Sequence, residues 1–164
     1  GAGRHAEASA RARETPGVED MQNQRAGNTH VLRLDRGEEI VTELTRFCKS
    51  RGIALGLVTG IGAVDRATIG LFRPAEKRYE ATEMTGDHEI LNLAGNVTTM
   101  NGEVYLHLHV TLGDAAHRAW GGHLNAAFVS ATAEIFVTVL EGACERAMDE
   151  TVGLNLMRFG SPTS

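Results

Sequence analysis

Apolar residues along this chain follow two periods, one typical of an α-helix and the other of β-strands. The helical period runs over residues 40–48, where apolar residues recur at three- and four-residue steps and form one face. Glu38 and Glu39 come at the start of this stretch, where the positive end of a helix dipole favours acidic side chains. Gly52 is placed to end the helix. The pattern therefore predicts one amphipathic helix.

The rest of the chain is patterned mostly as short strands, beginning with an alternating segment at residues 30–34. The glycine-rich stretch at residues 60–64 predicts a tight turn between two strands, and it lacks the third glycine and the following helix of a dinucleotide-binding loop. The sequence thus predicts an α+β fold, a single domain with a mostly antiparallel β-sheet and one main amphipathic helix. Further strands are expected at residues 53–58, 67–72, 79–84, 89–93, 95–98, 103–112, 124–130, 134–140 and 153–159.

The first 29 residues differ in composition from the remainder of the chain. They are rich in Ala, Arg, Glu, Gly and Gln and have no sustained periodicity. Such composition offers little to bury, so residues 1–29 are predicted to be a disordered extension, and residues 30–160 to be the folded domain. A length of 164 residues suits one domain with a sizeable core.

Bulk composition excludes some classes of function. The net charge of −5 argues against a large phosphate-binding surface, which would be built from clustered Lys and Arg. No apolar run is long enough to span a bilayer, and the N-terminus lacks an apolar segment of signal-peptide type. Cys48 and Cys144 have no metal-ligand spacing, and Cys48 falls on the apolar helix face. These features predict a cytoplasmic protein with no membrane segment.

Three histidines carry the strongest chemical signal. His107 and His109 lie two residues apart in a predicted strand, so their side chains share a face, while Leu106, Leu108 and Val110 point to the core. His123 comes after a loop short enough for the next strand to run back beside the first. Three histidines without a fourth protein ligand are typical of an open divalent-metal site, most often zinc. The alternative is chance clustering on an exposed strand face.

Two carboxylates are candidates for a catalytic role beside such a metal. A proton shuttle or an outer-shell partner would be wanted at an open zinc site. Glu89 and Glu134 each fall within an apolar strand segment, where a lone charge is costly. For both, the alternative is a paired or interface carboxylate. These residues do not identify a substrate.

Several short motifs, taken together and in order, resemble the PPC family, the plants and prokaryotes conserved domain. The resemblance covers residues 30–160. It implies a compact α+β protein that assembles as a homotrimer, with zinc at the histidine cluster in some relatives. The motifs are Gly37-Glu38-Glu39-Ile40, Gly60-Ile61-Gly62-Ala63-Val64, Glu89-Ile90-Leu91-Asn92-Leu93, Gly95-Asn96-Val97-Thr98, His107-Leu108-His109, Gly121-Gly122-His123-Leu124 and Asp149-Glu150.

The resemblance also raises DNA binding as an alternative function. Plant relatives carry this domain behind an AT-hook, an Arg-Gly-Arg-Pro minor-groove element, and bacterial members are labelled DNA-binding by analogy. This chain contains no Arg-Gly-Arg-Pro. A trimer could still gather a basic surface around the predicted helix, although a solvated helix face explains the same residues: Arg33, Arg36, Arg46, Lys49 and Arg51.

The family resemblance and the residues together predict a trimeric protein with a metal on three histidines. A small-molecule ligand could reach the open position of that metal. Strand 135–140 alternates poorly, as strands buried on both faces do, and neighbouring subunits would supply the second covering.

Overall fold

The computed structural model describes residues 21–160, in which eight strands and one helix succeed one another along the chain. Their order is β1–β2–α1–β3–β4–β5–β6–β7–β8. The bounds are β1 Gln22–Ala26, β2 Thr29–Asp35, α1 Ile40–Ser50, β3 Gly56–Arg73, β4 Arg78–Met100, β5 Glu103–Gly113, β6 Ala119–Val139, β7 Glu145–Asp149 and β8 Leu154–Arg158.

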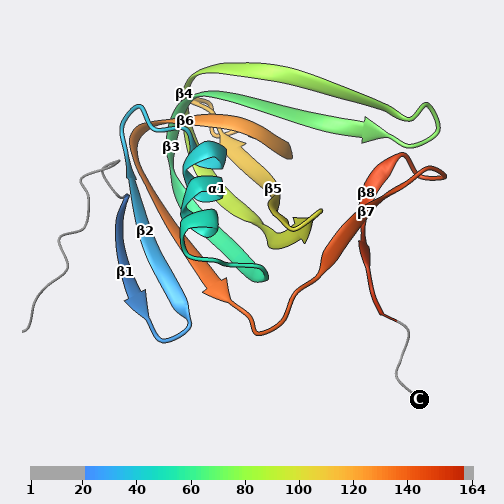
Figure 1. The fold of residues 1–164 in the computed structure, drawn as a ribbon. Coiled ribbons are helices and arrows are strands. Elements are labelled where there is room, and N and C mark those ends of the chain that lie inside the picture. Colours follow the sequence, from blue (N-terminus) through green and yellow to red (C-terminus); the bar gives the residue numbers. More distant parts are fainter. Residues whose placement is uncertain (1–20, 161–164) are drawn as a thin grey trace, which may run out of the picture.

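All of these strands belong to one sheet, and every pairing is antiparallel except that between β4 and β7. Strand β3 pairs with β4 and β6, and β5 also pairs with β4 and β6, so the four strands close a ring of pairings. The long β3–β4 hairpin projects from the rest of the sheet, and in the view of Figure 1 the β7–β8 hairpin lies beneath its outer end. The expected α+β fold with a mostly antiparallel sheet is confirmed.

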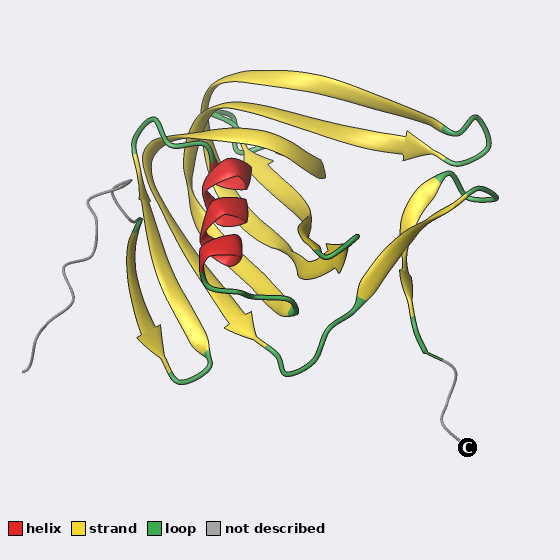
Figure 2. Ribbon diagram, in the orientation of Figure 1, coloured by secondary structure: helices red, strands yellow, loops and turns green. Residues whose placement is uncertain are grey.

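The helix α1 covers one face of the curled sheet (Figure 2). It buries Ile40, Leu44, Phe47 and Cys48, four of the five residues of the predicted apolar face. Glu39 lies just before the helix rather than in its first turn, and its carboxylate accepts hydrogen bonds from the backbone of Val41 and Thr42. These bonds satisfy N–H groups that a helix start leaves without partners.

The core is built from the inward side chains of the alternating strands and from α1. Burial raises the pKa of the Cys48 thiol to about 12, which fits the packing role predicted for this residue. No helix in the described part of the chain is long and apolar enough to cross a membrane. Fully buried large side chains include Leu32, Leu34, Leu44, Leu93, Leu112 and Ile135.

The predicted glycine turn at residues 60–64 is wrong, because these residues form the middle of the continuous strand β3. A Cβ on Gly62 would lie 2.7 Å from the Cα of Ala133, so glycine is needed for the close approach of β3 and β6. Register shifts on either side of Gly62 and Val64 mark bulges that bend the strand. Glycine here serves close packing and bending instead of chain reversal.

Other predicted short strands also run together into longer ones. The three expected between residues 79 and 98 are the single strand β4, and the two between 124 and 140 are the single strand β6. The short strand β7 was not predicted. Residues 22–26 form β1, paired with β2, whereas composition predicts a disordered extension there. Exposed polar residues can form an edge strand through backbone pairing alone. The rest of the predicted extension, residues 1–20, lies outside the described residues.

Candidate metal centre

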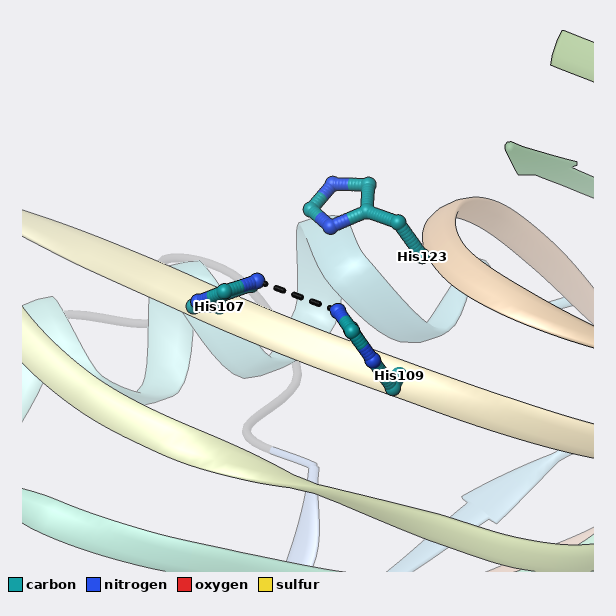
Figure 3. Close-up of side chains that lie close together, drawn as sticks. All are labelled: His107, His109 and His123. Atoms are coloured by element: carbon teal, nitrogen blue, oxygen red, sulfur yellow. Dashed lines mark hydrogen bonds between the residues drawn. The ribbon is translucent and has the colours of Figure 1, made fainter. Parts of the chain in front are cut away.

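The three histidines predicted from the sequence lie together on one side of the sheet. His107 and His109 come from β5, and His123 comes from β6, directly paired with His109. Their ring centroids are 5.0 to 5.7 Å apart. One nitrogen atom from each ring can be chosen so that all three lie within 4.8 Å of one another. Figure 3 shows the three rings converging on one space.

Strand alternation positions the first two histidines, as predicted. Leu108 between them is 2% exposed and Val110 is 3% exposed, so the opposite face of β5 is firmly held in the core. A one-residue slip would turn both histidines inward, and the cost of exposing these apolar side chains prevents it.

The glycine pair before His123 allows the strands to approach closely. A Cβ on Gly122 would lie 2.7 Å from the carbonyl oxygen of Gly70 in β3, and one on Gly121 would lie 3.0 Å from that of Val110 in β5. Because these positions have no side chains, β6 can pair closely with both β3 and β5, and this pairing places His123 beside His109. Glycine at both positions therefore permits the close strand packing that the site requires.

The spacing of the nitrogen atoms suits a tetrahedral ion. The Nε2 atoms of His107 and His109 are 3.2 Å apart and form a hydrogen bond when one of them carries the proton (Figure 3). Two nitrogens each 2.0–2.1 Å from a tetrahedral ion are about 3.3 Å apart. The pair therefore already has the separation of two zinc ligands.

Burial and neighbouring charges lower the pKa of two of the imidazoles, His107 and His123. Burial, and then the neighbouring His109, His123 and Arg146, lower the pKa of His107 to about 4. Burial and then His109 also lower the pKa of His123. At neutral pH both rings thus have a free nitrogen lone pair, which is the form that binds a metal.

A tyrosine stands beside the histidines. The Tyr79 ring, from the start of β4, packs edge-on against His123 with centroids 5.8 Å apart. Its hydroxyl donates to Asn125 Oδ1 and lies over Gly70, where a Cβ would overlap it. Tyr79 closes one side of the cluster and was not predicted from the sequence, because its strand alternates weakly.

The structure does not bring the two predicted carboxylates to the histidines. Glu89 pairs with Gly113, four residues along β5 from His109, and Glu134 lies eleven residues along β6 from His123. Both side chains are exposed in the single chain, and the interface alternative given for them stays a prediction. Neither joins the three-histidine group among residues 21–160.

Sequence reasoning missed a second polar cluster on the histidine-bearing face. Asn96 pairs with His107, and Thr98 pairs with Tyr105 in the next row of the same two strands. Arg146, from β7, donates hydrogen bonds to both Asn96 and Thr98. Alternation around Asn96 could have placed it on this face, but nothing in the sequence signals that Arg146 reaches it.

Comparisons with known proteins agree with the fold. The model of the Plants and Prokaryotes Conserved (PCC) domain matches residues 21–141. A crystal structure of a proposed DNA-binding protein from Bacteroides thetaiotaomicron is 35% identical with a TM-score of 0.84, covering 86% of this chain and 99% of that one. A metal-containing protein from Archaeoglobus fulgidus is 36% identical with a TM-score of 0.77, covering 87% of this chain and 100% of that one.

Two further kinds of relative are similar to the chain. A plant- and prokaryote-conserved (PPC) protein from Pyrococcus horikoshii is 32% identical with a TM-score of 0.75, covering 90% of this chain and 99% of that one. The bifunctional protein GlmU of Synechococcus sp. (strain JA-3-3Ab) is 34% identical over 127 residues, 76% of this chain. The chain spans only 16% and 19% of the two curated GlmU proteins that it matches. The chain therefore belongs to the Plants and Prokaryotes Conserved (PCC) domain family.

Proposed function

We propose that this chain is a homotrimeric PCC-domain protein that holds one divalent metal ion, with zinc the first choice, on His107, His109 and His123. The observation that carries the proposal is the convergence of three imidazoles on one space, with nitrogen atoms within 4.8 Å of one another. The description of the Archaeoglobus fulgidus relative as metal-containing supports it.

Three neutral ligands leave a coordination position open for water or a small-molecule ligand. A zinc ion bound in this way supplies Lewis acidity: it lowers the pKa of bound water and polarises a carbonyl or phosphoryl oxygen. The chain's own contribution is to hold the imidazoles in register between β5 and β6 and to lower the pKa of His107 and of His123. The proposal is tested by measuring the metal content of the untagged wild-type protein. A protein without stoichiometric metal would contradict it.

The trimer part of the proposal rests on an exposed apolar patch on the outer face of the sheet. Leu57, Ile61 and Phe136 are 53%, 57% and 42% exposed, and they lie on one face of the β3–β6 pairing. By register this face continues from Phe136 through Thr59 and Ala94 to His109. Subunits that cover the patch would therefore border the histidine cluster, and such boundaries often form ligand clefts.

Light scattering is expected to give three times the chain mass of 17.6 kDa for the wild type at micromolar concentration. Phe136→Glu should shift the mass to that of the single chain, because a charge would be buried unpaired in the interface. Phe159→Glu is the matched control, since Phe159 is exposed outside the patch. A monomeric wild type, or a trimeric Phe136→Glu variant, would contradict the interface.

DNA binding is the second candidate function, favoured by the description of the Bacteroides relative. The basic residues around α1 give it little support, because Lys49 pairs with Glu103, Arg46 with Glu43 and Arg33 with Asp35. We expect duplex-DNA titrations at low and moderate salt to show no salt-sensitive affinity. A steep loss of affinity with added salt would instead favour the DNA-binding function.

A further inference from the structure

Among residues 21–160, a buried arginine beside the histidine cluster has no acidic partner. Arg146 is 6% exposed, and among residues 21–160 no carboxylate forms an ion pair with it. Its guanidinium donates to three neutral oxygens: Thr98 Oγ1 at 2.8 Å, the Asn155 backbone carbonyl at 2.9 Å and Asn96 Oδ1 at 3.0 Å. Its Cζ also lies 4.9 Å from the centre of the Tyr105 ring.

This arrangement leaves both charge and hydrogen-bonding capacity unused. An arginine has five N–H donors, and the bonds within residues 21–160 occupy three of those of Arg146. The buried Asn155 Oδ1, on the adjacent strand β8, also lacks a partner in this part of the chain. Burying a cation against neutral groups alone is costly, and a neutral side chain could fasten β7 to β4 without that cost.

The arginine lies on the same face as the proposed metal ligands and one row away. Asn96 is opposite His107, and the next pair along the strands, Thr98 and Tyr105, lies beneath the guanidinium. Two residues along a strand span about 7 Å. The guanidinium therefore lies near the histidines on one face of the sheet, and it contacts Asn96, which shares a row with His107.

We infer that Arg146, with Asn96 beside it, binds the oxyanionic end of a small ligand whose other end reaches the metal on the three histidines. The inference rests on the proposed metal site and names the substrate class of that site: a small molecule with a carboxylate or phosphate group. The planar donor fork of arginine matches either anion, and the anion supplies the negative charge that Arg146 lacks.

Anion binding by the zinc-loaded and the chelator-treated protein tests the inference. Acetate and inorganic phosphate are titrated calorimetrically, with acetamide as the uncharged probe that has the shape of acetate. The wild type should bind at least one of the anions, and Arg146→Gln should weaken that binding at least about tenfold without changing zinc content. The stronger of the two anions identifies whether the ligand is a carboxylate or a phosphate. Arg158→Gln is the matched control, because it removes the same charge from the same hairpin at an exposed position.

Asn96→Asp is a second variant that keeps the arginine and gives it a carboxylate within the chain. It should weaken anion binding to a similar extent. If Arg146→Gln fails to fold, Asn96→Asp still tests the arginine site. Unchanged anion affinity in either folded variant, or equal binding of acetamide and acetate by the wild type, would overturn the inference. Absence of zinc from the wild type would instead refute the metal proposal, while anion binding that requires Arg146 in the metal-free protein would still support the arginine site.

Discussion

Replacing His109 by alanine is expected to remove the metal from the protein. The wild type should contain about one divalent ion per chain, and His109→Ala should retain almost none after dialysis. His109 links the other two residues, because its Nε2 lies 3.2 Å from that of His107 and its backbone pairs with that of His123. Even the loss of an outer-shell partner lowers metal affinity by about 10–100-fold, so the loss of one of three ligands should lower it by more than about 100-fold. Elemental analysis and a competitive zinc titration measure both quantities.

The control for this experiment is a histidine outside the cluster. His117 lies in the turn between β5 and β6 with a φ of 61°, so it is changed to asparagine, which tolerates that conformation. His117→Asn should bind metal as the wild type does. His109 is exposed, so His109→Ala should keep the thermal stability of the metal-free wild type. A full equivalent of metal in His109→Ala would refute the three-histidine site.

The parts of the site that could be predicted are those fixed by local alternation. The two-residue period places His107 and His109 on one face because Leu108 must be buried, and no knowledge of the other strands is needed. The position of His123 could be predicted from a short connection, since a strand that turns back quickly pairs with its predecessor. The apolar helix face was similarly evident from a 3.6-residue period.

The parts that could not be predicted depend on contacts between distant segments. The glycines of residues 60–64 suggested a turn, but only the approach of β6 shows that they serve close packing. Arg146 reaches Asn96 and Thr98 across about 50 residues of chain, as their separations of 50 and 48 show. Such a contact leaves no local period in the sequence. Glu89 was a candidate for a role beside the metal because it lies in an apolar stretch. Such a stretch does not reveal which of its residues face outward.

Gly95→Ala is expected to destabilise the protein and to disturb the metal site together. Gly95 of β4 pairs with Leu108, and a Cβ there would overlap the carbonyl oxygen of His107 and lie 2.9 Å from the Cα of Leu108. Both are backbone atoms of β5, so the methyl group can be accommodated only if the two strands move apart. Overpacking of this kind costs about 1–3 kcal/mol, and a clash with backbone belongs at the upper end of that range. Urea unfolding of the metal-free protein measures the loss.

The same displacement moves His107, so zinc affinity should fall in Gly95→Ala along with stability, whereas His109→Ala should lose metal alone. Gly160→Ala is the control, because a Cβ at Gly160 meets no atom within 4 Å. That control should match the wild type in both unfolding and zinc titration. A Gly95→Ala protein with wild-type stability would show that β4 and β5 can separate freely at His107. The histidine geometry would then not depend on the close pairing of these strands, and the metal would have to organise its own ligands on binding.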